Sequence, residues 1–283
     1  MCPGCTMATA FRAILNATSE PTIVAHATGC GEICIGNFPF TAAKFPWIHS
    51  LFENAPSVIS GVAAAIESKK RRGEIPAEKN FQLLAVGGDG AFADIGLNWL
   101  SGAFDRETPA VFVCFDNEGF MNTGHQKSAT TPFGGATSTT PAGKFKPKKN
   151  LMKIAAAHGV KYAAQTSAGN IFDLQKKAQK AFATPGASFL NILCACPTNW
   201  KFKPADGIEI LKLATATNFW PLFEIENGNW KLNSSRGKTP LVEFLQTQKR
   251  FAPLLKNPEN LTAAQNLIDE NFTEIEKLAG ANS

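Results

Sequence analysis

The strongest constraint on the fold of this 283-residue chain is an alternation of apolar, β-branched runs with amphipathic helical patterns. Strands are expected at 22–27, 81–86, 110–115, 161–166 and 188–194, and helices at 7–17, 57–72, 94–104, 150–159 and 171–183. Strands that alternate with helices build units in which the strands run parallel and the helices cover the sheet. We therefore predict an α/β fold with an open, mainly parallel sheet and helices on both faces.

The alternation fades after about residue 200, which suggests a C-terminal extension. The stretch 219–233 is typical of a short hairpin that turns at Asn227 and Gly228. The stretch 260–280 has the pattern of an amphipathic helix. We expect one domain over 1–200 and an extension over 201–283 that packs on the same domain or on partner subunits.

Polar or cysteine-bearing loops follow four of the expected strands. Cys30 follows the first, a Gly-Asp-Gly turn the second, the segment 116–124 the third, and Cys194 and Cys196 end the last. In an open parallel sheet these loops share the carboxyl edge, where ligands bind. Residues far apart in the sequence are therefore expected to form one site.

Composition indicates an ordinary globular protein. No run of about 18 uncharged apolar residues occurs, and the start lacks the features of a signal peptide. Seven cysteines in a chain of this length favour a reducing compartment with free thiols. We expect a soluble, cytoplasmic protein with no nucleic-acid and no membrane partner, since the net charge of +5 is mild. The lysines at 144, 146, 148, 149 and 153 indicate either a solvated loop or a contact with an acidic partner.

The segment "AVGGDGAFADIGLNWL" is typical of a strand, a glycine turn and a helix. Gly88 and Gly90 allow the backbone to approach a bulky anion, and the helix that follows offers unpaired N–H groups. Asp89 would repel a bare phosphate but suits a divalent cation that bridges to one. A simple structural turn is the alternative, because these residue types are common in loops.

A second oxygen-bearing segment follows the next strand. Asn117 lies 28 residues after Asp89 (117 − 89), and Gly119 adds a main-chain carbonyl. Carboxylate, carboxamide and carbonyl oxygens are the ligands that Mg²⁺ takes beside substrate phosphates. Gly-Asp-Gly followed at about this interval by Asn resembles the signature of thiamine diphosphate enzymes. The alternative is two ordinary turns at a sheet edge.

The motifs "CPGC", "ATGCGE", "GGDGAFADIGL", "CFDNEGFMNTGHQKSATTPFGGATSTTPAG" and "CPTNW" occur in that order. Together they resemble the β subunits of 2-oxoacid:ferredoxin oxidoreductases, most closely those that act on pyruvate, over nearly the whole chain. The resemblance implies a thiamine diphosphate-binding fold, with 1–200 carrying both that cofactor and an iron–sulfur site. It also implies oxidative decarboxylation of pyruvate with coenzyme A to acetyl-CoA, CO₂ and reduced ferredoxin, or the reverse.

The same resemblance implies a role for individual residues. It places Mg²⁺ on Asp89, Asn117 and the carbonyl of Gly119, and the diphosphate against the main chain of Gly88, Gly90 and Ala91. Asn122 would project toward the reacting carbon as the catalytic residue. The ligands of one 4Fe-4S cluster, held close to the thiamine cofactor, would be Cys2, Cys5, Cys30 and Cys196.

Partners also follow from the resemblance. The glutamate that protonates the cofactor's pyrimidine and the ferredoxin-like cysteine-rich segment would lie on an α subunit and a cluster-bearing subunit, with free ferredoxin as acceptor. Other 2-oxoacids (2-oxoglutarate, a branched-chain 2-oxoacid or oxalate) remain alternative substrates. A non-redox thiamine-dependent decarboxylase would keep Asp89 and Asn117 but would not need the cysteines.

The cysteines allow other readings. Four thiolates can bind Zn²⁺ as well as iron, and a Cys-x-x-Cys pair can be a redox couple. Cys194 is the rival of Cys196, since a single residue separates the two thiols in the sequence. The remaining expectations concern single residues: buried packing for Cys114, a place near the site for Cys34 and a structural role for His158. A pocket position for His125 is only the lesser alternative. The sequence departs from the family at Thr6 and Met7, where glycine and a small or polar residue are usual.

Overall fold

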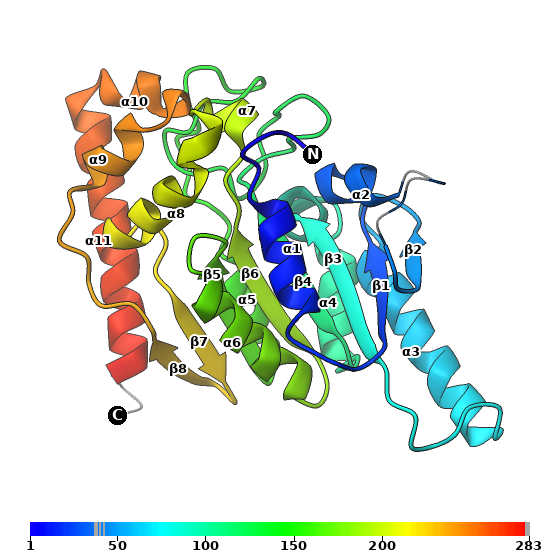
Figure 1. Ribbon diagram of the computed structural model, residues 1–283. Coiled ribbons are helices and arrows are strands. Elements are labelled where there is room, and N and C mark those ends of the chain that lie inside the picture. Colours follow the sequence, from blue (N-terminus) through cyan, green and yellow to red (C-terminus); the bar gives the residue numbers. More distant parts are fainter. Residues whose placement is uncertain (37–38, 40, 42, 281–283) are drawn as a thin grey trace.

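An eight-stranded sheet forms the centre of the molecule, seen in a computed structural model that describes residues 1–36, 39, 41 and 43–280 (Figure 1). The strands are β1 (Thr22–His26), β2 (Trp47–His49), β3 (Gln82–Gly88), β4 (Val111–Asp116), β5 (Tyr162–Ser167), β6 (Ser188–Leu193), β7 (Phe223–Glu226) and β8 (Asn229–Leu232). Their order across the sheet is β2-β1-β3-β4-β6-β5-β7-β8. The first six strands are parallel, and β7 and β8 are antiparallel to their neighbours.

The strand order reverses at β1, because the chain leaves β1 toward β2 on one side and returns to β3 on the other. Loops that leave the carboxyl ends of strands on the two sides of such a reversal diverge and leave a crevice. Register places Gly88 opposite Phe115, so the loops after β3 and β4 start side by side. The topology thus brings the Gly-Asp-Gly turn and the Asn117 segment to one edge.

Helices cover both faces of the sheet. The α-helices are α1 (Met7–Leu15), α2 (Cys30–Ile35), α3 (Ala55–Arg71), α4 (Leu97–Asp105), α5 (Leu151–Ala157), α6 (Ile171–Ala183), α7 (Pro197–Trp200), α8 (Gly207–Ala216), α9 (Leu241–Gln246), α10 (Ala252–Leu255) and α11 (Pro258–Gly280). Strand β4 shows how the two layers arise: Val111, Val113 and Phe115 pack with α1, α6 and α8, while Phe112 and Cys114 pack with α3, α4 and α5. Cys114 is therefore core packing, as predicted.

The sequence predictions hold for the main elements. All five predicted strands and the six predicted helices are present, and Asn227 and Gly228 form the predicted hairpin turn, both with positive φ. The expected helix 94–104 is interrupted, because a π-helical turn (Gly90–Asp94) precedes α4. Strand β2, helix α2 and the helices α7 to α10 were not predicted. They are three to ten residues long, too short to show a reliable period.

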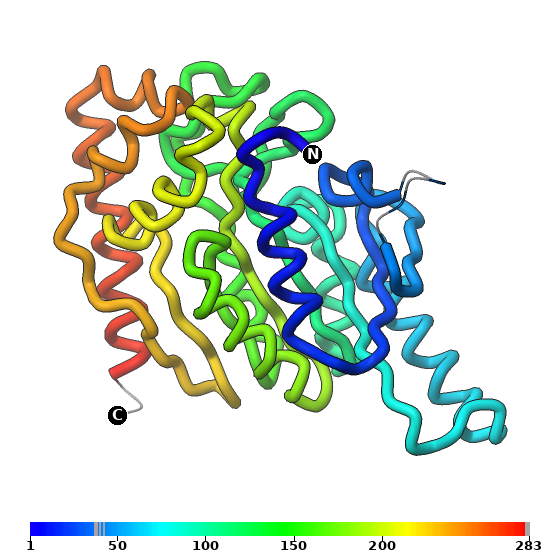
Figure 2. Tube along the Cα trace, in the orientation of Figure 1, coloured from blue at the N-terminus to red at the C-terminus, as the bar shows by residue number. Residues whose placement is uncertain are grey.

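The chain starts at the carboxyl edge of the sheet. Figure 2 shows the N-terminal segment running beside the loops that follow β4 and β6 before it enters α1. The hairpin β7–β8 extends the same sheet from β5, and the long helix α11 packs against β8. The boundary at residue 200 stays a prediction. Within the described residues, no helix combines the length and apolarity that a membrane crossing requires.

Gly96 is expected to tolerate no side chain. A Cβ there would lie 2.0 Å from the carbonyl oxygen of Ala91 and 2.5 Å from that of Glu53, and both are backbone atoms that cannot turn away. We expect Gly96→Ala to lower the free energy of unfolding by roughly 2–3 kcal/mol. Gly61→Ala in α3 is the matched control, since no atom lies within 4 Å of its Cβ. It should raise stability by up to about 1 kcal/mol; equal effects in chemical denaturation would contradict this packing.

Candidate functional site

Three predicted residues meet where β3 and β4 end. One terminal atom of the Asn117 amide lies 3.0 Å from Asp89 Oδ1 and 2.8 Å from the carbonyl oxygen of Gly119. All of this is buried, with Asp89 0% and Asn117 6% exposed. If that atom is the amide nitrogen, it donates to both oxygens. If it is the amide oxygen, three oxygens converge without a proton between them, which is what a cation requires.

A second pair of carboxyl groups lies directly behind this point. The Thr130 hydroxyl is 2.7 Å from Asp89 Oδ2 and 2.9 Å from Asp116 Oδ1. A hydroxyl has one proton to donate, so one of the two carboxyl groups must contribute a proton when no cation is present. Burial, and then the charge of Asp116, raises the pKa of Asp89 to about 8. Without a cation at this site, the folded protein therefore favours the protonated form of Asp89.

The turn after Asp89 forms a narrow cradle. Gly90 begins the π-helical turn, and a Cβ at Gly90 would lie 2.4 Å from the Phe120 ring. Phe120 in turn stacks on Phe52 with the ring centroids 5.7 Å apart. Short π-helical turns are frequent at functional sites. A side chain at position 90 would fill the cradle.

A small cavity of about 40 Å³ opens over this cradle. Its lining includes every residue predicted to bind thiamine diphosphate or Mg²⁺ apart from the buried Asp89: Cys30, Gly88, Gly90, Ala91, Asn117, Gly119 and Asn122. The structure thus brings these residues, from the loops after β1, β3 and β4, to one place. The cavity is too small to enclose a whole dinucleotide-sized ligand.

The N-terminal cysteine pair is held by a turn. The amide of Cys5 donates to the carbonyl of Cys2 at 3.1 Å, and Gly4 has a φ of +79°. Pro at the second and Gly at the third position suit such a turn. A Cβ on Gly4 would lie 2.5 Å from the backbone of Pro204, so the turn is packed against the chain after α7.

A larger cavity of about 430 Å³ collects the predicted cluster ligands. Cys2, Cys5, Cys30 and Cys196 all line it, together with Cys34 and Cys194. Burial, and then the nearby Cys196, Cys5 and Cys2, raises the pKa of Cys30 to about 12. Thiols this close to one another resist ionisation, because neighbouring thiolates repel each other. A bound metal cation would offset this repulsion.

The two cavities share one wall. Met7, Cys30, Asn117, Met121 and Asn122 line both. The departures from the family pattern lie here as well: the amide of Ala195 donates to Thr6 Oγ1 at 2.9 Å, which joins the N-terminal segment to the segment after β6. The site of the glycine turn and the site of the cysteines are therefore adjacent.

The cysteines differ in their surroundings. All seven, each within the described residues, are free thiols. Cys196 Sγ lies 3.3 Å from Thr198 Oγ1. Among the neighbouring thiols, Cys196 contributes most to raising the pKa of both Cys5 and Cys30. Cys194 is 1% exposed, and burial raises its pKa strongly. Among the described residues, no three His, Cys, Asp or Glu side chains form a group compact enough to hold a single metal ion.

His158 lies where it was expected, and His125 has the pocket position that was the lesser alternative. His125 lines the cysteine cavity, and its Nε2 is 3.0 Å from Thr198 Oγ1. His158 contacts the Ser101 hydroxyl at 2.8 Å and the Phe104 ring edge-on, so its role is structural.

The sequence did not predict a buried ion-pair network behind the Asn117 segment. Glu118 is 0% exposed, and its carboxylate lies 2.8 Å from Lys148 Nζ and 2.7 Å from Arg250 Nη2. Lys148 also pairs with Asp116 at 3.3 Å. Burial alone would lower the pKa of Lys148, but the charges of Asp116 and Glu118 raise it. No periodicity or motif marks such contacts, because they join positions 30 to 132 residues apart.

The lysine-rich segment is therefore only partly solvated. Lys146 is exposed, but Lys144 is 9% exposed and donates to the carbonyls of Ala129 and Thr131. For Lys148 the acidic partner lies within the same chain. The expectation of a fully solvated loop is wrong because the segment passes behind two buried acids.

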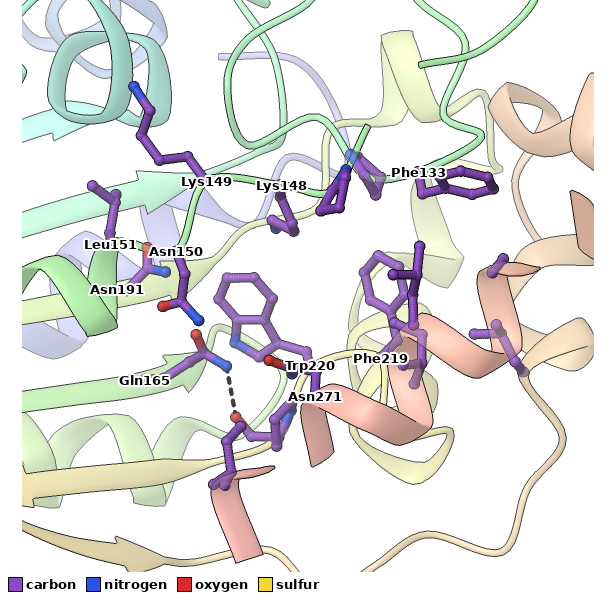
Figure 3. A pocket seen from close by; sticks show the side chains of 18 of the residues that line it. Phe133, Lys148, Lys149, Asn150, Leu151, Gln165, Asn191, Phe219, Trp220 and Asn271 are labelled. Atoms are coloured by element: carbon purple, nitrogen blue, oxygen red, sulfur yellow. Dashed lines mark hydrogen bonds between the residues drawn. The ribbon is translucent and has the colours of Figure 1, made fainter. Parts of the chain in front are cut away.

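A third cavity of about 160 Å³ lies on the far side of Lys148, whose Nζ is 4.5 Å from the centre of the Trp220 ring (Figure 3). Figure 3 shows amide side chains, among them Gln165 and Asn191, on one side of it and aromatic rings beyond. None of the predicted glycine, cysteine or acidic residues lines it. The candidate active site is therefore the pair of cavities at the carboxyl edge.

Comparison with known proteins identifies relatives over most of the chain. The family model "Thiamine pyrophosphate enzyme, C-terminal TPP binding domain" matches residues 27–192. Pyruvate synthase subunit PorB of Pyrococcus furiosus is 42% identical over 94% of this chain and 88% of that protein. PorB of Thermotoga maritima is 39% identical over 95% and 85%, and ketoisovalerate oxidoreductase subunit VorB of Pyrococcus horikoshii is 37% identical over 98% and 91%.

A solved structure shares the fold. A chain of 2-oxoglutarate:ferredoxin oxidoreductase from Magnetococcus marinus superposes with a TM-score of 0.59 and 23% identity. The match covers 70% of this chain and 64% of that one. At this level of identity the likeness concerns the fold alone.

Proposed function

The chain belongs to the PorB family of pyruvate synthase subunits, within the thiamine pyrophosphate enzymes, and from that membership we propose the chemistry of its site. It acts as the β subunit of a pyruvate:ferredoxin oxidoreductase and binds thiamine diphosphate, Mg²⁺ and one 4Fe-4S cluster. The complex converts pyruvate, coenzyme A and oxidised ferredoxin to acetyl-CoA, CO₂ and reduced ferredoxin, or runs the reverse reaction. A cytoplasmic location belongs to this proposal.

The oxygen atoms around Asp89 fit Mg²⁺. Mg²⁺ takes octahedral oxygen ligands at about 2.0–2.1 Å, so neighbouring ligands lie roughly 3 Å apart. The Asn117 amide atom lies 3.0 Å and 2.8 Å from the oxygens of Asp89 and Gly119, which matches that spacing. With its oxygen turned inward, Asn117 would bind the cation together with the Asp89 carboxylate and the Gly119 carbonyl.

The thiols fit a cluster better than a single ion. A zinc site would need its sulfurs about 2.3 Å from one centre, and the described side chains form no group that compact. A four-iron cluster spreads its ligands over a larger body, and the cavity of about 430 Å³ has Cys2, Cys5, Cys30 and Cys196 around it. We therefore favour 4Fe-4S over zinc and over a thiol redox couple.

The shared wall of the two cavities is the observation that carries the proposal. Thiamine diphosphate supplies carbanion chemistry on a 2-oxoacid, and an iron–sulfur cluster supplies one-electron transfer. Cys30 and Asn122 border both cavities, so the thiamine cofactor would lie on one side of these two residues and the cluster on the other. The main chain of Gly88, Gly90 and Ala91 would bind the diphosphate, and Asn122 would direct its amide toward the reacting carbon.

Partner chains would complete the site. The cofactor cavity measures only about 40 Å³ within this chain, and large apolar side chains beside it are exposed, among them Leu51 at 57% and Ile95 at 55%. Such patches mark interaction surfaces. We propose an α subunit on this side and a cluster-bearing ferredoxin-like subunit as the route to ferredoxin.

Purification of the complex without oxygen tests the function. The expected product is brown, contains about four iron atoms per copy of this chain from this site, and bleaches with dithionite. A colourless chain with zinc would refute the proposal, and loss of iron with retained thiamine-dependent decarboxylation would indicate the non-redox alternative. Turnover with pyruvate, 2-oxoglutarate, branched 2-oxoacids and oxalate would then identify the substrate, which matters because VorB is 37% identical to this chain.

A further inference from the structure

The residue between Asn117 and Gly119, two of the three proposed Mg²⁺ ligands, has an unusual backbone. Glu118 has a φ of +68°, in the left-handed region that non-glycine residues rarely adopt. That turn lets the Asn117 side chain and the Gly119 carbonyl face the same point. Such a conformation is strained for a residue with a side chain and persists only where the surroundings impose it.

Contacts on the backbone and the side chain of Glu118 hold it in this conformation. Its amide donates to Asp116 Oδ1 at 3.0 Å, and its carbonyl accepts from the Thr131 hydroxyl at 2.8 Å. Its side chain reaches Lys148 and Arg250, which come from distant parts of the chain. A glycine would adopt the same φ without strain, so the side chain itself is what the position requires.

Arg250 connects this turn to the cysteine segment. Its guanidinium lies 3.8 Å from the centre of the Trp200 ring, at the end of the helix that starts after Cys196. Trp200 Nε1 donates to the carbonyl of Asn117 at 3.0 Å, and the Trp200 amide bonds to the carbonyl of Cys196 at the same distance. The path Glu118–Arg250–Trp200 thus joins the metal loop to the residue proposed as a cluster ligand.

Arg250 also has donors to spare. It is 3% exposed, and its Nη1 and Nη2 have no well-directed hydrogen-bond acceptor among the described residues, although Nη2 forms the ion pair with Glu118. A buried, incompletely paired cation is costly unless the site later holds negative charge.

We propose that Arg250 is a positioning residue that holds the Mg²⁺ loop and the Cys196 helix in fixed relation to each other. This inference rests on the proposed function but assigns to the C-terminal extension a part in the site. Groups that orient metal ligands from behind typically contribute 10- to 100-fold to metal affinity. The pair with Glu118 and the stack on Trp200 both need the planar guanidinium, which lysine does not provide.

The test compares Arg250→Lys with Arg236→Lys in the anaerobically purified complex. Arg236 is a matched control because it also pairs with a glutamate, Glu276, and lies over an aromatic ring, Phe272, but on the surface. We expect Arg250→Lys to raise the dissociation constant for Mg²⁺, at saturating thiamine diphosphate, by about tenfold. It should also change the electron paramagnetic resonance spectrum of the reduced cluster, whereas Arg236→Lys should change neither.

A second variant keeps the test decisive if Arg250→Lys does not assemble. Trp200→Phe retains a ring under the guanidinium but removes the donor to the Asn117 carbonyl, and it should weaken Mg²⁺ binding several-fold. Normal Mg²⁺ affinity in whichever variant assembles would overturn the coupling. A changed Mg²⁺ affinity with an unaltered cluster spectrum in Arg250→Lys would also overturn it. In both cases the proposed function stands. A wild-type complex without Mg²⁺ dependence or cluster would overturn both.

Discussion

Replacing Asp89 with alanine is expected to abolish Mg²⁺-dependent binding of thiamine diphosphate while the iron content stays unchanged. Asp89 is the one charged group among the three proposed oxygen ligands, and the cysteines lie in the neighbouring cavity. Loss of a group that only orients a metal ligand costs 10- to 100-fold, so loss of this ligand should exceed about 100-fold. Titration calorimetry of the complex with thiamine diphosphate, and iron analysis of the same sample, would measure both.

The isosteric change Asp89→Asn separates binding from stability. The folded state raises the pKa of Asp89 from 3.8 to about 8, so folded protein binds more protons than unfolded protein between these values. The contribution of Asp89 to stability is therefore fully present below pH 4 and is lost as the pH rises toward 8. The amide is neutral throughout and escapes this loss.

We thus expect Asp89→Asn, stripped of cofactor with a chelator, to melt above the stripped wild type at pH 8 and much closer to it at pH 5. The same variant should gain nothing from added Mg²⁺ and thiamine diphosphate, which should stabilise the wild type. Asp105→Asn, at an exposed position on α4, is the control and should behave as wild type. Cofactor-induced stabilisation that survives in Asp89→Asn would remove Asp89 from the Mg²⁺ site.

The sequence predicted the sheet because long, buried, parallel strands have a strong local signature. Strand β4 reads "VFVCFD", with every residue buried and consecutive side chains in opposite layers. Helix α6 was predicted with its exact bounds from its apolar face alone. Strand β2 has three residues at the edge of the sheet, and its pairing with β1 depends on tertiary contacts that no local pattern encodes.

The candidate site also contains some residues that the sequence singled out and others that it did not. Asp89, Asn117, Cys30 and Cys196 were singled out because each follows a strand, and the topology brings those loops together. Cys2 and Cys5 follow no strand and were singled out by their Cys-x-x-Cys spacing. Thr130, which bridges Asp89 and Asp116, lies in a threonine-rich loop whose role the sequence could not assign. Arg250 carries no sequence signal, and Trp200 was noted only as the end of the CPTNW motif, since an ion pair and a ring stack across the fold depend on the final packing.

The second large effect concerns the choice between two neighbouring thiols. Cys196→Ala is expected to lose the iron bound by this chain, wholly or down to about three atoms of the four, with loss of the reduced cluster's spectrum. Cys196 lines the cavity next to Thr198. It is also the thiol that contributes most to raising the pKa of Cys5 and of Cys30. Anaerobic iron analysis and electron paramagnetic resonance measure the outcome directly.

Cys194→Ala is the matched control, two positions away on the same segment. The Cys194 amide bonds to the carbonyl of Asp116 at 2.9 Å, so it continues the ladder between β6 and β4, and the side chain is 1% exposed. Its truncation should lower the melting temperature slightly, because it removes one buried sulfur, and should leave about four iron atoms in place. If Cys194→Ala loses the iron and Cys196→Ala keeps it, the ligand is Cys194. Both thiols line the same cavity, so this outcome would exchange one ligand for the other without moving the segment after β6.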